Sequence, residues 1–265
     1  MPCPSATFTV WASAWLAGAA APDDVLDALV PWALAHDVQA ADADTAVATT
    51  LPPPGSPVSS LAFLLALLRR ASPEVPARLV LPVPGDVRGL PGPGVFSREA
   101  TAAGEGVLFV EAGLGVVPST VADGVLRWTV YPVPEPGPPV GFVALSQAER
   151  DLREQVRQSA SVLTSLGVAR HRPGVREEIA ATLRARPESM WPAGMPGQAL
   201  RVLQHADEVE AILAAASIDE PGGALSASAA EARREALRPI ETAVRVARRA
   251  AVAEAVRVLA ASPLV

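Results

Sequence analysis

The loop from Gly85 to Gly94 has the composition most typical of a binding site in this sequence. It contains four glycines, and its only charged side chains are those of Asp86 and Arg88. The backbone beside a glycine can approach a ligand closely, and an arginine can hold a carboxylate or phosphate through two parallel hydrogen bonds. One hypothesis, kept as an alternative function, is that Asp86, Arg88 and Gly89, with Arg127 near them, bind a small anionic ligand, in a binding protein or a hydrolase. The alternative is a rigid connection in which Arg88 pairs with Asp86.

Other residues that could perform catalysis or hold a metal ion form no complete motif. None of the three histidines has a second histidine at i+3 or i+4, and the single cysteine is Cys3, so the usual zinc ligand sets are absent. No GxSxG motif is present. Asp42 and Asp44 form a DxD pattern, but this pattern often occurs by chance in polar loops. We therefore predict no catalytic residue, no metal site and no cofactor, and the sequence favours a protein that is not an enzyme.

Lysine is absent, since all 22 basic residues are arginine. Phosphate-binding P-loops, pyridoxal phosphate Schiff bases and kinase-type sites need a lysine, so these classes are excluded in their usual forms. The formal net charge of −6 argues against a general nucleic-acid-binding surface. The stretch from Glu231 to Arg257 is a local exception, with seven arginines and four glutamates. Nucleic-acid binding through this Arg-rich helix is an alternative function, although the interleaved glutamates favour a solvated helix face.

Two features indicate contacts with other proteins. A loop near the middle of the second half contains Met190, Trp191 and Met195, and Met and Trp together can form an adaptable partner-binding surface. The alternative is that these side chains close the end of a helical bundle. Near-heptad Ala and Val residues from Ile240 to Val258 predict a homodimer through long helices, although such seams also occur inside monomeric bundles.

Hydrophobic periodicity and chain-breaking residues divide the first half, residues 1–131, into helices and short strands. The expected helices are Trp11–Leu16, with a strand at Thr7–Val10 as the alternative, Pro22–Pro31 and Ser56–Ala71. The expected strands are Thr45–Thr50, Ala77–Val83, Gly106–Ala112, Leu114–Pro118 and Val125–Tyr131. Gly113 suits a hairpin turn, and Leu126, Trp128 and Val130 should point to one side of the last strand.

Five prolines among the ten residues from Tyr131 to Val140 favour a stiff, extended connector, to which we assign residues 132–145. Residues 146–265 follow as a helical half of four helices. Ser146 with Glu149 begins its first helix and Ser228 with Glu231 its last as capping boxes, and Pro239 should kink or restart the last helix.

The sequence therefore predicts an α+β fold, with a small β-sheet and packed helices in the N-terminal half and a helical bundle in the C-terminal half. The longest apolar run, Leu61–Leu68, is too short to span a membrane, and no basic residue precedes the first apolar segment as in a signal peptide. We predict a cytoplasmic protein. Its predicted function is that of a non-catalytic interaction or regulatory protein, with another protein or a second copy of itself as partner.

Overall fold

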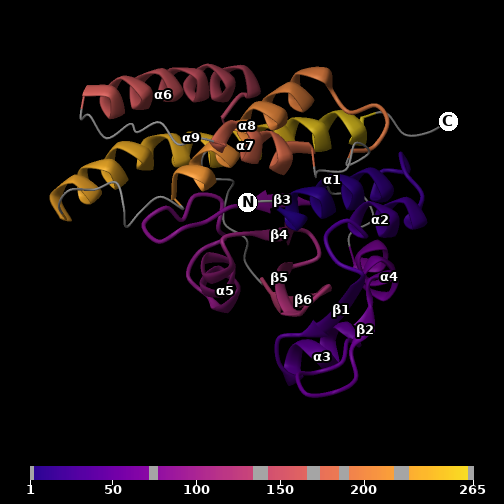
Figure 1. Ribbon diagram of the computed structural model, residues 1–265. Helices are drawn as coiled ribbons and strands as arrows, with labels where there is room; N and C mark the ends of the chain where they lie inside the picture. Colours follow the sequence, from indigo (N-terminus) through magenta and orange to yellow (C-terminus); the bar gives the residue numbers. More distant parts are fainter. Residues whose placement is uncertain are drawn as a thin grey trace. The chain divides into compact units, whose positions relative to one another are not determined.

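The computed structural model describes residues 3–71, 77–133, 143–165, 174–184, 191–217 and 227–261 (Figure 1). Its contacts divide the chain into two compact units. We call Pro2–Phe142, together with Ser189–Pro196 and Val252–Val265, the sheet unit, and Val143–Glu188 with Gly197–Ala251 the helical unit. The predicted α+β class is confirmed, because a mixed sheet and helices precede a run of helices. The proline-rich segment 134–142 lies outside the described residues.

The sheet unit is built on six strands in the order β2-β1-β6-β5-β4-β3. Their bounds are Ala35–Ala40 for β1, Ser59–Ser60 for β2, Arg78–Val80 for β3, Gly106–Phe109 for β4, Leu114–Ala122 for β5 and Val125–Pro132 for β6. The β4–β5 hairpin is confirmed, and Gly113 takes the left-handed conformation at its turn, with a φ of 62°. Strands β1 and β6 are parallel, and every other pair is antiparallel.

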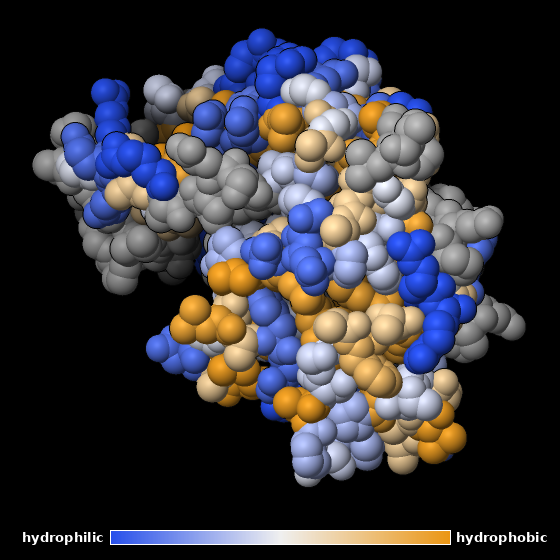
Figure 2. Space-filling view, turned by 90° about the vertical axis from the view of Figure 1, so that its right-hand side faces the viewer, coloured by the Kyte–Doolittle hydropathy of each residue, from blue (hydrophilic) through white to orange (hydrophobic). Residues whose placement is uncertain are grey.

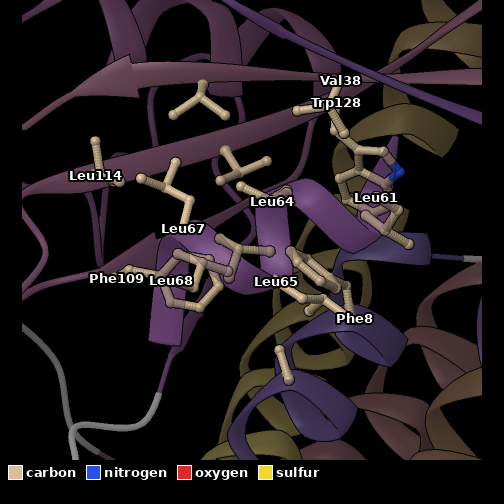
Figure 3. Close-up of a cluster of buried hydrophobic side chains, with 14 of the residues drawn as sticks. Phe8, Val38, Leu61, Leu64, Leu65, Leu67, Leu68, Phe109, Leu114 and Trp128 are labelled. Atoms are coloured by element: carbon tan, nitrogen blue, oxygen red, sulfur yellow. The ribbon is translucent and has the colours of Figure 1, made fainter. Parts of the chain in front are cut away.

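One face of this sheet carries the main hydrophobic core. Helices α1 (Pro4–Leu16), α2 (Pro22–Leu29) and α4 (Leu61–Ala71) supply its apolar side chains. The predicted alternation in β6 is confirmed, because Leu126, Trp128 and Val130 are all buried in this core. Figure 3 shows the leucines of α4 among Phe8, Phe109 and Trp128, and the rings of Phe8 and Trp128 have centroids 4.9 Å apart.

Helix α5 (Val95–Ala103) covers part of the opposite face. Its Phe96 is 2% exposed and belongs to a second, smaller core with Leu108, Val117 and Val80. The ring lies so close to Gly115 that a Cβ atom at this position would approach it to 2.3 Å. Helix α5 therefore packs closely against β4 and β5.

Two expectations for the N-terminal half were wrong, and one strand was missed. Thr45–Thr50 is not a strand, because Asp42 caps a helix, α3 (Ala43–Thr49), by accepting a 2.8 Å hydrogen bond from the Thr45 amide. This local capping outweighs the β-propensity of Thr and Val. The polar stretch Ala35–Ala40, for which no element was predicted, is strand β1. The helix expected from Ser56 begins at Leu61, after β2.

The helical unit contains α6 (Leu145–Ser165), α7 (Val175–Arg184), α8 (Gly197–Ser217) and most of α9 (Ala227–Ala260). These are the four helices that the sequence predicts. Pro239 lies inside α9, which continues through it as one helix, so the chain does not begin a new helix there. Among the described residues, no helix combines the length and the apolar composition needed to cross a membrane.

Candidate functional site

The Gly85–Gly94 loop contains a local ion pair. The Arg88 guanidinium donates to Asp86 through Nε to Oδ1 and through Nη2 to Oδ2, both at 2.7 Å. The hydrogen bond to Asp86 raises the pKa of Arg88. A one-residue β-bridge between Val83 and Asp86 fixes the start of the loop. This is the pairing that the rigid-connection interpretation predicts.

Arg127 lies elsewhere in the sheet unit. It is on β6, and β5 and β4 separate that strand from β3, which leads into the loop. Its Nη2 lies 3.3 Å from Oδ2 of Asp37 on β1. The structure therefore does not bring Arg127 together with Asp86, Arg88 and Gly89, and a ligand site formed by these four residues stays a prediction.

The second half of the loop lines a pocket. Pro91, Gly92, Pro93 and Gly94 form one wall of a pocket of about 340 Å³, which the first turn of α5 and Pro132 and Val133 of the β6 end complete. Ser97 donates a hydrogen bond of 2.5 Å to the Gly92 carbonyl and so fixes the loop to α5. Neither Asp86 nor Arg88 is among the lining residues.

A row of polar residues crosses the part of the sheet beside α5. In the strand register Ser60 is opposite Asp37, Asp37 opposite Arg127, and Arg127 opposite Ser119. Directly opposed residues point to the same side of a sheet, so β2, β1, β6 and β5 each place one of these side chains in one line. Ser60 and Ser119 are exposed, and Asp37 and Arg127 are partly exposed. We call these four residues the polar row.

Exposed apolar side chains lie at the β1 end nearest the polar row. Leu34 is 89% exposed, Val30 53% and Val121 42%; we call these three residues the Leu34 patch. The Leu34 side chain lies 3.7 Å from the position of a Cβ on Gly124, in the β5–β6 turn, and the Ala35 amide donates to the Gly124 carbonyl at 3.1 Å. Figure 2 shows apolar residues (orange) mixed with hydrophilic ones (blue) in the lower half of the face that it draws.

His36 connects this region to the core. Its Nε2 donates to the Leu29 carbonyl at 3.0 Å, and its Nδ1 accepts from Trp128 Nε1 at 3.1 Å. Since an indole N–H only donates, the ring is neutral with its proton on Nε2. Burial lowers the pKa of His36, although hydrogen bonds to the Leu29 and Ala33 carbonyls and the charge of Asp37 act in the opposite direction. The segment between α2 and β1, which carries Val30 and Leu34, is thus fixed at both ends.

The Met and Trp residues of the second half that were predicted to bind a partner differ from one another in burial. Met190 lies outside the described residues, Trp191 is half-buried, and Met195 is 8% exposed. The burial of Met195 fits the alternative in which this loop fills a gap, and partner binding by these residues stays a prediction.

Arg234, Arg248 and Arg257 of α9 form ion pairs. Arg248 is 6% exposed, and its Nη2 lies 2.6 Å from Asp207 and 2.8 Å from Glu210, both on α8. Burial raises the pKa of Glu210, but the hydrogen bond and charge of Arg248 outweigh it, and the net shift is downward. Arg234 and Arg257 pair with glutamates three residues earlier. The near-heptad seam is buried within the chain, from Ile240 at 7% exposed to Ala255 at 0%.

Among the described residues, no three His, Cys, Asp or Glu side chains are placed to hold a metal ion.

Comparison with protein families gives two adjacent matches: the Rv1486c-like protein N-terminal domain over residues 5–144, and the corresponding C-terminal domain over residues 146–249. The chain belongs to the Rv1486c-like family.

Members of the Rv1486c-like family from mycobacteria match along nearly the whole chain. The uncharacterized protein Rv1486c of Mycobacterium tuberculosis is 39% identical, and the uncharacterized protein ML1804 of Mycobacterium leprae is 36% identical. Each alignment covers 94% of this chain and 96% of the relative. No solved structure matches the chain.

Sequence reasoning found Arg127 but not its surroundings. The polar row draws one residue from each of four strands, and β1 and β2 were not predicted. An apolar–polar alternation in Val38, Gln39 and Ala40 is the one local signal that indicates β1. The Leu34 patch leaves no signal, because a leucine before a strand ordinarily contributes to a core.

Proposed function

We propose that this protein is a non-catalytic interaction protein, and that it binds a protein partner on the surface formed by the polar row and the Leu34 patch. The observation that carries the proposal is the 89% exposure of Leu34, which lies three residues before Asp37 of the polar row. Large exposed apolar side chains rimmed by polar residues are typical of protein–protein contact sites.

The support beneath this surface is rigid, which favours binding. Arg127 and Asp37 lie opposite each other on the paired strands β6 and β1. The other side of these two strands carries the fully buried Trp128 and Val38. The His36 hydrogen bonds fix the segment that precedes β1. A pre-organised surface loses little conformational entropy when a partner binds, so more of the contact energy contributes to affinity.

Site-specific photo-crosslinking tests this function and captures a partner of any sequence. A benzoylphenylalanine replaces Ser119, in the polar row, and in a matched control it replaces the exposed Ala160 on α6. Each full-length variant is irradiated in mycobacterial cells. We expect a discrete adduct of higher mass from position 119 and none from position 160. No adduct from position 119, or the same adduct from both positions, would contradict the proposal.

A second candidate function is the binding of a small ligand in the 340 Å³ pocket, because this volume lies in the range of small-molecule sites. Gly94 has an extended backbone, and a side chain there would meet open space. Gly94→Leu should therefore fill the pocket with little strain. We expect any compound that raises the melting temperature of the unmodified protein to have no effect on this variant; an equal rise in both would place the compound elsewhere.

A further inference from the structure

The formal charge of this protein is divided unequally along the chain. Residues 1–133 contain six arginines and twelve Asp and Glu residues, a net charge of −6, whereas residues 134–265 contain sixteen of each and are neutral. The whole net charge of the protein therefore belongs to the part of the sequence that forms the sheet. Any partner of the sheet unit approaches an acidic surface.

Part of this acidity lies beside the Leu34 patch. Asp27 is exposed in the last turn of α2, and its carbonyl accepts a 3.2 Å hydrogen bond from the amide of Val30. Asp123 is exposed in the β5–β6 turn, next to Gly124 and thus beside Leu34. Neither carboxylate forms an ion pair with a described arginine; the nearest arginine in the strand register, Arg127, pairs with Asp37. The apolar patch is thus rimmed by uncompensated negative charge.

This charge selects among the possible occupants of the patch. A second copy bound symmetrically would bring a second acidic rim to the same interface, and the like charges would repel each other. Nucleic acids and anionic lipid surfaces carry negative charge and would be repelled. A segment with an apolar side chain for Leu34 and with Lys or Arg for Asp27 and Asp123 is complementary in both respects.

We infer that the Leu34 patch binds a basic, amphipathic segment of another protein, with Leu34 as the apolar anchor and Asp27 and Asp123 as contacts for its cations. This inference rests on the proposed interaction function and names the partner's chemistry. Leu34 is the central contact because it is the most exposed of the three apolar residues.

The test uses the full chain and two synthetic amphipathic peptides, one of Leu and Lys and its counterpart of Leu and Glu. Fluorescence anisotropy measures the affinity of each. We expect the Leu/Lys peptide alone to bind, with an affinity that falls as salt increases. Leu34→Gln should weaken binding about tenfold, the loss expected when one buried leucine contact is removed. Asp27→Asn with Asp123→Asn should also weaken it.

Val47→Gln is the matched control, since Val47 is an aliphatic residue of α3 that is 83% exposed. Both variants change exposed side chains, so melting temperatures equal to that of the unmodified protein verify that they fold. Equal affinities of Leu34→Gln and Val47→Gln, or no binding of the Leu/Lys peptide, would overturn the inference. The adduct at position 119 is a separate result, so the proposed function can stand when this partner chemistry fails.

Discussion

His36 is a single residue whose protonation state matters to the sheet unit. Its neutral ring bridges the end of α2 and the buried indole of Trp128. A protonated ring carries a hydrogen on both nitrogens and cannot accept from Trp128, which would leave that N–H without its acceptor. The hydrogen-bond pattern therefore needs the neutral form.

From this follows a pH dependence of stability. Because burial lowers the pKa of His36 in the folded chain, the unfolded chain takes up this proton first as the pH falls. The stabilisation is complete above about pH 6.5 and is lost as the pH falls through the folded-state pKa, and the broken hydrogen bond costs about 1 kcal/mol. Urea unfolding followed by tryptophan fluorescence should show this loss in the unmodified protein. The same dependence in His36→Gln would assign it to other groups.

At the scale of elements, the attachment of α5 to the sheet depends on a glycine. Gly115→Ala would place a Cβ atom 2.3 Å from the Phe96 ring, and overpacking of this kind costs about 1–3 kcal/mol. We expect the free energy of unfolding to fall by this amount in the Gly115→Ala variant. In a Phe96→Ala background the same change should cost little, because the ring is gone. Equal costs in both backgrounds would show that the contact is not the cause.

The contact between α8 and α9 depends on a buried cation. Arg248→Met would remove the guanidinium that lies against Asp207 and Glu210, and breaking a buried ion pair from one side costs about 3–5 kcal/mol. Arg257→Met is the control, since this arginine is exposed and pairs with Glu254 within one helix, a pair worth only about 0.5 kcal/mol. Thermal unfolding followed by circular dichroism should separate the two variants; equal melting temperatures would contradict the role of Arg248.

Elements with strong apolar patterns were predictable from the sequence, and those decided by local capping or pairing were not. Strand β6 alternates, and α4 carries a dense run of leucines, so periodicity indicated both. The Thr45–Thr50 stretch has β-forming residues, but the Asp42 side chain selects a helix. Strand β1 contains His, Asp and Gln, and it is a strand because β6 pairs with its whole length.

At the scale of the whole molecule, the end of α9 belongs to the sheet unit together with residues 191–196. Leu259, 3% exposed, lies 3.7 Å from the position of a Cβ on Gly194. Leu259→Ala should therefore destabilise the sheet unit by about 2–4 kcal/mol, as measured by tryptophan fluorescence. Val162→Ala on α6, where the side chain is 45% exposed, should have little effect. An unchanged transition in Leu259→Ala would favour the boundaries predicted from sequence, in which all of residues 146–265 form a separate half.

The candidate surface is formed by residues that lie far apart in the sequence, which is why sequence alone did not find it. Residues 30–37, 60 and 119–127 are brought together by strand order, and Ser60 pairs with Asp37 in a strand of two residues. The sequence motifs predicted an interaction protein, but they placed the contacts at the Met and Trp loop and the final helix. Only the register of the sheet places Arg127 beside Asp37 and in line with Ser119.

Hydrogen–deuterium exchange on the full chain, with and without the Leu/Lys peptide, tests the central claim most directly. Exchange reports on each backbone segment in the unmodified protein, so it locates the contact without any substitution. We predict that the peptide slows exchange in residues 30–37 and 119–127 of the sheet unit. Protection confined to α6, α7 or α8 of the helical unit, with no change in those two segments, would contradict the claim that the sheet surface is the interaction site.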